Sequence, residues 1–192
     1  MQTQVHNNFI QYLGFDVHLS NNLTAVKEYI HFIERKFLLV MITEYFDESL
    51  VLLRRLMNWS MADIFYKRSN AGQTKSGTVF IGEEKEKLLN LEHNLADQML
   101  YKHFNHSLWV KIEKEQGFKE ELEIFKRLNK KVEEFCFSDE LQRDKNVRME
   151  VALRSKSIFT IGEEECLAVR IREGKAPDLV ETLNNYCTFR KW

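Results

Sequence analysis

Three carboxylates stand close together in this chain of 192 residues, at Glu44, Asp47 and Glu48. A carboxylate beside a bound substrate can accept the proton of a reacting hydroxyl. These three follow an apolar run at 37–42, and in open α/β sheets ligands bind just beyond the carboxyl ends of the strands. The alternative is structural, because acidic side chains also stabilise the first turn of a helix through its dipole. The spacing leaves both interpretations open.

One strand and two helices would position these carboxylates. Residues 37–42 read FLLVMI, without polar alternation, which is typical of a strand buried on both faces of a parallel sheet. Apolar residues at spacings of 3, 4 and 3 predict a helix over 23–34, and a leucine- and arginine-rich run predicts another over 49–56. We therefore expect an α/β fold, rich in helices, with a central buried parallel strand at 37–43.

Three sequence motifs resemble the galactose 3-O-sulfotransferase (galactosylceramide sulfotransferase-like) family. Residues 44–59 read EYFDESLVLLRRLMNW, with DIFYK following at 63–67, and residues 100–109 read LYKHFNHSLW, close to the family's L-Y-x-H-F-N-x-(T/S)-x-W. Phe15-Asp16 is a third and weaker match. The resemblance is good over residues 8–135 and poor over the rest.

The resemblance implies a partial sulfotransferase fold of the P-loop type. Members of the family transfer a sulfuryl group from 3'-phosphoadenosine 5'-phosphosulfate (PAPS) to the 3-hydroxyl of galactose on glycolipids and glycoproteins. They do so on the lumenal side of the Golgi membrane, held by an N-terminal anchor. No apolar stretch here approaches the ~20 residues that span a bilayer. We therefore expect residues 1–192 to be a single, incomplete sulfotransferase domain, its C-terminal portion, with an anchor only in a full-length chain.

The resemblance also implies an acceptor, a galactose-containing glycolipid or glycan. Glu44 and Asp47, then Glu48, are the best candidates for catalysis, although the general base itself is unknown. We expect His103, Asn105 and Trp109 to bind the acceptor, because a Trp face stacks on a sugar while His and Asn bind hydroxyls. Equally, Trp109 could pack in the core and His103 could interact with the end of a helix.

The donor site is less complete in the sequence. A P-loop is excluded at 72–78, because Thr78 stands where the lysine must be. Sulfotransferases often hold the 3'-phosphate of the donor with a late loop, and the right residue types for this lie at Lys67, Arg68, Asn70, Lys75 and Ser76. The alternative is a solvated basic loop. Since the family's principal donor loops are not found here, we expect residues 1–192 alone to transfer no sulfate.

Metal chemistry and nucleic-acid binding are not expected. His103 and His106 are three residues apart, but no third ligand is evident beside them, and sulfuryl transfer from a nucleotide needs no metal. The 28 basic residues nearly cancel the 29 acidic ones, so there is no basic field for nucleic acid. The other class of function that fits is a catalytically inactive helical interaction module on a sulfotransferase scaffold.

Cysteines and sequons bear on the compartment. One pair among Cys136, Cys166 and Cys187 could form a disulfide in a lumenal protein, whereas in a cytosolic protein all three would be reduced. The sequence chooses neither the compartment nor the pair. Sequons occur at Asn22, Asn58 and Asn105, and we expect Asn105, in a polar turn between two helices, to be the more accessible of the last two.

Further helices are predicted in the rest of the chain, and the charge runs of the tail, at 154–156 and 163–165, are interpreted as solvated faces. Helices are expected over 83–104, with Leu88, Leu91, Leu95 and Met99 buried, and over 118–135. Ser60 and Asp63 form a capping box. Pro177 opens a final helix.

Overall fold

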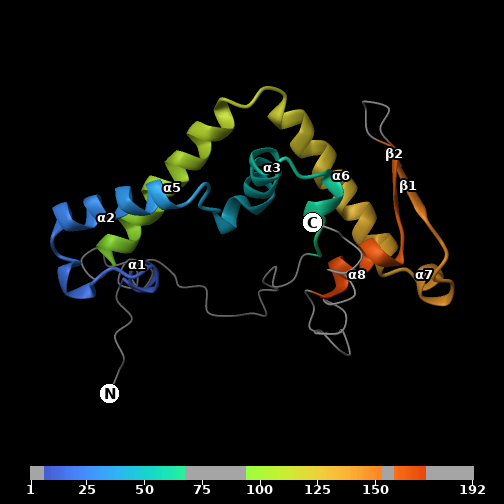
Figure 1. The fold of residues 1–192 in the computed structure, drawn as a ribbon, viewed down its shortest axis with the longest axis horizontal. Helices are drawn as coiled ribbons and strands as arrows, with labels where there is room; N and C mark the ends of the chain where they lie inside the picture. Colours follow the sequence, from blue (N-terminus) through green and yellow to red (C-terminus); the bar gives the residue numbers. More distant parts are fainter. Residues whose placement is uncertain (1–6, 68–93, 153–157, 172–192) are drawn as a thin grey trace, which may run out of the picture. The chain divides into compact units, whose positions relative to one another are not determined.

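The computed structural model describes residues 7–67, 94–152 and 158–171 (Figure 1). In these ranges the chain is rich in helices and has one two-stranded sheet, consistent with an α/β domain. The chain divides into two compact units, residues 1–49 with 74–116 and residues 50–73 with 117–192. None of the helices in the described ranges is long and apolar enough to cross a membrane.

In the first unit, helix α2 (Leu23–Lys36) confirms the predicted helix and extends it to Lys36. Its N-terminus is capped by the Asn22 side chain, which accepts hydrogen bonds from the backbone N–H groups of Thr24 and Ala25. The buried stripe is Val26, Ile30 and Ile33, whereas Leu23 remains exposed. Through this stripe α2 packs alongside helix α5 (Figure 1).

Helix α5 (Leu95–Glu113) differs from the prediction in its end and in its buried face. The stripe repeats every four residues, through Ala96, Leu100, Phe104, Leu108 and Ile112. Leu95 and Met99 are only half-buried, and Leu88 and Leu91 lie outside the described residues. Because Leu108 and Ile112 continue the stripe, the helix runs through residues 105–109, where a polar turn was predicted; that prediction is wrong.

The short helix α1 (Asn8–Tyr12) has no capping side chain of its own at its N-terminus and is capped instead by residues at the start of α5. Asp97 accepts hydrogen bonds from the backbone N–H groups of Phe9 (3.0 Å) and Ile10 (2.8 Å). Asn94 Oδ1 accepts from Asn7 N, and Asn7 Oδ1 accepts in turn from Asp97 N. Each N-terminus thus satisfies backbone N–H groups of the other that have no partner within their own helix.

The predicted central strand at 37–43 is wrong. Residues 37–42 are irregular, and Thr43–Tyr45 form a 3-10 turn, η2, at the start of helix α3 (Phe46–Leu56). Phe37 and Leu38 are 51% and 57% exposed, and no strand pairs with this segment within the described ranges. Instead, the segment is held from α5, where Lys111 Nζ donates to Leu38 O over 2.9 Å. An apolar run makes a buried strand only where neighbouring strands complete its ladder.

The second unit is built on helix α6 (Phe118–Cys136), which confirms the predicted helix at 118–135. Glu121 of α6 accepts hydrogen bonds from both Arg54 and Arg55, so one carboxylate holds two guanidinium groups of α3. Farther along, the buried Asn129 side chain accepts from Tyr66 N over 2.9 Å. The predicted capping box of Ser60 and Asp63 is present and begins a 3-10 turn, η3 (Met61–Ile64).

The C-terminal part of this unit contains structure that was not predicted. Helix α7 (Asp139–Arg143) leads to an antiparallel pair, β1 (Met149–Ala152) and β2 (Ile158–Ile161), and then to helix α8 (Glu163–Ile171). The three glutamates from Glu163, expected to form only a solvated face, make the first turn of α8. The final helix predicted from Pro177 lies outside the described residues.

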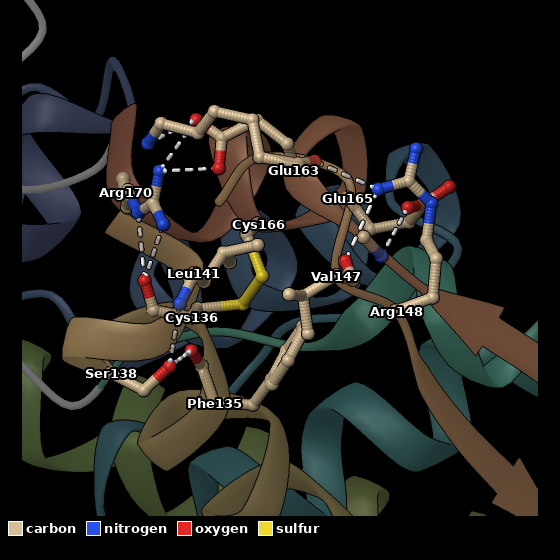
Figure 2. The surroundings of a disulfide bond; sticks show 12 residues. Phe135, Cys136, Ser138, Leu141, Val147, Arg148, Glu163, Glu165, Cys166 and Arg170 are labelled. Atoms are coloured by element: carbon tan, nitrogen blue, oxygen red, sulfur yellow. Dashed lines mark hydrogen bonds and ion pairs between the residues drawn. A yellow bond between two sulfur atoms is a disulfide. The ribbon is translucent and has the colours of Figure 1, made fainter. Parts of the chain in front are cut away.

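A disulfide ties α8 to the end of α6, joining Cys136 and Cys166 with Cα atoms 5.0 Å apart (Figure 2). Arg170 reinforces this junction, because it donates two hydrogen bonds to Cys136 O and also pairs with Glu163. Ser138 caps α7 just beyond the disulfide by accepting from Leu141 N. The pairing left open by the sequence is therefore Cys136 with Cys166.

Candidate functional site

The three carboxylates lie on residues 43–49, which we call the acidic elbow, and their surroundings differ. Glu44, in η2, is exposed, Glu48 is half-buried, and Asp47 is buried at 6% exposure. Asp47 and Glu48 both belong to the first turn of α3, as the structural alternative predicted. The elbow itself is closed by Ser49, whose buried Oγ accepts a hydrogen bond from Ile42 N over 3.1 Å. Of the three, Glu44 is the carboxylate most exposed to a substrate in solution.

Two aromatic residues of α5, Tyr101 and Trp109, interact with Glu44 or with its neighbour Tyr45. The Tyr45 ring meets the Trp109 ring edge-on, with centroids 4.9 Å apart. Desolvation raises the pKa of Tyr101 above its usual value, and the nearby charges of Glu44 and Tyr45 raise it further. We call Glu44, Tyr45, Tyr101 and Trp109 the aromatic–acid face. Its members come from η2 and α5, two elements of the same unit.

His103 contacts a different group of residues. Its Nε2 lies 3.1 Å from Glu34 Oε2 of α2, and its ring meets the His31 ring edge-on at 5.4 Å. Burial raises the pKa of the Glu34 carboxyl, but the charge of His103 and polar contacts with His103, His31 and Ser107 outweigh it, so this pKa lies below its usual value. We call His31, Glu34 and His103 the His–Glu cluster.

Asn105 joins neither group. It is half-buried near the middle of α5, and its Oδ1 is inaccessible to water and has no hydrogen-bond partner among the described residues. Residues two apart on a helix do not share a face, so Asn105 and His103 point in different directions. The structure thus places the three residues predicted to bind the acceptor on one helix but does not bring them into one site.

Of the predicted donor residues, only Lys67 lies in the described ranges. Its Nζ is 3.9 Å from the centroid of the Phe137 ring, a cation–π contact within the second unit. Arg68, Asn70, Lys75 and Ser76 lie outside the described residues. Their role at the 3'-phosphate of a donor stays a prediction.

His31 and Glu34 were not predicted from the sequence to be functional residues. They are three residues apart on α2, so they lie on one face of the helix, next to each other. This spacing inside a well-predicted helix was visible in the sequence. What the sequence could not show is that α2 lies against α5, which places His103 beside both.

Comparison with known proteins gives a consistent result. A model of the galactose-3-O-sulfotransferase family matches residues 1–176. The galactosylceramide sulfotransferase of Bos taurus is 36% identical over 126 residues, which cover 65% of this chain and 29% of that protein. The galactose-3-O-sulfotransferase 2 of Sus scrofa is 29% identical over 169 residues, covering 84% and 41%. The galactose-3-O-sulfotransferase 3 of Mus musculus is 36% identical over 143 residues, covering 70% and 32%. No solved structure matches the chain.

These matches define a sulfotransferase domain. More particularly, the chain belongs to the galactose-3-O-sulfotransferase family, because the family model covers most of its length. The resemblance inferred from the motifs is confirmed, and the family match continues beyond residue 135, where the resemblance was poor. The chain spans 29% to 41% of the length of the three relatives named above.

Proposed function

We propose that the protein containing this chain transfers a sulfuryl group from PAPS to the 3-hydroxyl of galactose in a glycolipid or glycoprotein. The observation that carries this proposal is the family match over residues 1–176. The reaction needs a base for the sugar hydroxyl and cations for the charge that develops on the donor phosphate. No metal is needed for this transfer.

In this reaction the aromatic–acid face would bind the acceptor. Trp109 offers a ring for the apolar face of galactose, and the exposed carboxylate of Glu44 can accept a hydrogen bond from a sugar hydroxyl. The 4.9 Å contact between Tyr45 and Trp109 supports this assignment, because it joins the element that carries Glu44 to α5. Asp47 is buried, so we assign it to the support of the elbow and not to substrate contact.

The residues that would bind the donor, PAPS, are proposed from their types alone. Lys67, Arg68, Asn70, Lys75 and Ser76 would hold the 3'-phosphate of PAPS. One contact of this kind contributes about 1–3 kcal/mol, which by itself corresponds to millimolar binding or weaker. Residues 1–192 alone are therefore expected to bind the donor weakly and to transfer no sulfate.

We place the reaction in the Golgi lumen, as for the family. The Cys136–Cys166 disulfide supports this assignment, because disulfides persist in oxidising compartments and are rare in the cytosol.

The test is a radiolabelled sulfate-transfer assay on a galactoside, with a longer protein that contains this chain and with residues 1–192 alone. The longer protein should transfer sulfate. In it, Trp109→Ala and Glu44→Gln should raise the KM for the acceptor more than the KM for PAPS, while Glu28→Gln, an exposed acidic residue on α2, should change neither. Absence of transfer and of PAPS binding in the longer protein would favour the inactive interaction module instead. Transfer by residues 1–192 alone would show that the donor site is complete without further loops.

A further inference from the structure

The His–Glu cluster combines two imidazoles and one carboxylate from two helices. His31 and Glu34 lie on α2 and His103 lies on α5. One ligand atom from each side chain lies within 4.8 Å of those from the other two. All three residues belong to the first unit, in which α2 packs against α5.

The spacing of these atoms suits one small metal ion. Glu34 Oε2 lies 3.6 Å from His31 Nδ1 and 3.1 Å from His103 Nε2. Zinc binds nitrogen and oxygen at about 2.0–2.1 Å, so two ligand atoms at tetrahedral angles stand about 3.4 Å apart. The two observed separations lie on either side of that value. Two of the three separations therefore fit one ion as they stand, and the ligand atoms of His31 and His103 lie within 4.8 Å of each other.

Two further observations favour a set of metal ligands over a simple ion pair. His103 Nε2 is inaccessible to water and, among the described residues, has no hydrogen bond, because its 3.1 Å approach to Glu34 has the distance of an ion pair but not the direction of a hydrogen bond. Ser107 Oγ, one turn along α5 from His103, lies 3.4 Å from Glu34 Oε1. That contact orients the carboxylate and leaves Oε2 for the two histidines, as outer residues do around metal ligands.

We propose that His31, Glu34 and His103 bind one divalent transition-metal ion, with zinc as the best fit. Imidazole and carboxylate together suit zinc and its neighbours, whereas calcium and magnesium prefer sets of oxygen ligands. Three protein ligands leave one coordination position for water. The side chains are 58%, 37% and 27% exposed, for His31, Glu34 and His103 in turn, so the site faces solvent at His31, while His103 Nε2 lies at its buried end.

This site differs from the one that the sequence analysis set aside. In the sequence, His103 pairs with His106, three residues away, and no third ligand is evident beside them. In the structure His106 is exposed, and the partners of His103 come from α2, which lies about 70 residues earlier in the chain. The proposal does not depend on sulfate transfer, for which no metal was expected.

The test uses metal-free protein of residues 1–192, prepared with a chelator. Zinc affinity is measured by competition with a chromophoric chelator, and cobalt(II) is added separately to report coordination by its visible absorption. We expect one equivalent of each metal to bind, with the intense absorption of tetrahedral cobalt and a higher melting temperature in zinc. His31→Ala and Glu34→Gln should each weaken zinc binding by more than about 100-fold, and Ser107→Ala by about 10- to 100-fold.

Matched controls are His106→Ala on α5 and His18→Ala, both at exposed positions outside the cluster. Neither should change the zinc affinity or the cobalt spectrum. His31→Ala removes an exposed side chain, so its fold should be retained, and circular dichroism will check this. Binding that is unchanged in His31→Ala and Glu34→Gln, or lost equally in His106→Ala, would overturn the proposal. So would cobalt that shows only the weak absorption of an octahedral aquo ion.

Discussion

At the scale of single residues, Ser49 is the side chain that closes the acidic elbow. Its Oγ is fully buried and accepts a hydrogen bond from Ile42 N. Ser49→Ala would leave this buried N–H without an acceptor, which costs about 1–3 kcal/mol. We expect chemical denaturation to show a loss of stability of that size. The control is Thr43→Ala at an exposed position of the same elbow, where the change should be within about 0.5 kcal/mol. Equal effects of the two variants would contradict the role of Ser49.

The structure also reverses the expected order of accessibility of the sequons at Asn58 and Asn105. Asn105 is half-buried in α5, whereas Asn58 lies exposed after α3 and Asn22 is exposed at the start of α2. Since a glycan must extend into solvent, we expect Asn22 and Asn58 to carry glycans in secreted protein and Asn105 to carry none. Each of Asn22→Gln and Asn58→Gln should remove one glycosidase-sensitive step in gel mobility. A step that disappears in Asn105→Gln would contradict this order.

The sequence predicts the structural role of a residue well when that role depends on neighbours a few positions away in the chain. The capping box of Ser60 and Asp63 and the first-turn acids of α3 were predicted, because such contacts join residues within a few positions. The approach of His103 to Glu34 was not, since it depends on how two helices pack. The burial of Asp47 beside the exposed Glu44 was missed for the same reason.

At the scale of elements, helices with a continuous apolar stripe were predicted well. The helix predicted at 118–135 is an example. Its apolar stripe continues for about five turns, and the observed helix ends only one residue later, at Cys136. The prediction of a strand at 37–42 failed because an apolar run alone does not show whether neighbouring strands are present to pair with it. The hairpin of β1 and β2 was missed, since strands of four residues give too short a pattern to separate from a charged surface.

The reciprocal caps between α1 and α5 give an element-scale prediction. Asp97 binds the N–H groups of Phe9 and Ile10, and α1 has no side-chain cap of its own. Asp97→Ala should therefore release α1 while α5 persists, at a cost of about 1–2 kcal/mol. Hydrogen exchange should accelerate at the amides of residues 9–12 and stay slow at Phe104 and Leu108. The control is Asp16→Ala, which removes the cap of a separate 3-10 turn, η1 (Val17–Leu19). Unchanged exchange at Ile10 in Asp97→Ala would contradict this account.

At the scale of the whole molecule, the Cys136–Cys166 disulfide closes a loop that contains α7, β1 and β2. The two cysteines are 30 positions apart, and a loop of this size restricts the unfolded chain by about 3–4 kcal/mol. Because Cys166 and Arg170 lie on α8 and both bind the end of α6, loss of the disulfide should leave Arg170 as the main remaining link there.

The double variant Cys136→Ser/Cys166→Ser should therefore melt about 10 °C lower than the unmodified chain. A reductant should lower the melting temperature of the unmodified chain towards that of the double variant and leave the double variant unchanged. Cys187→Ser is the matched control, because it removes a cysteine and keeps the pair; it should melt like the unmodified chain and should have no reactive thiol. The unmodified chain should titrate with one thiol, since two of its three cysteines are paired. If three thiols react before unfolding, or if reductant leaves the melting temperature unchanged, the bond does not stabilise this unit, and the support that it gives to an oxidising compartment is lost.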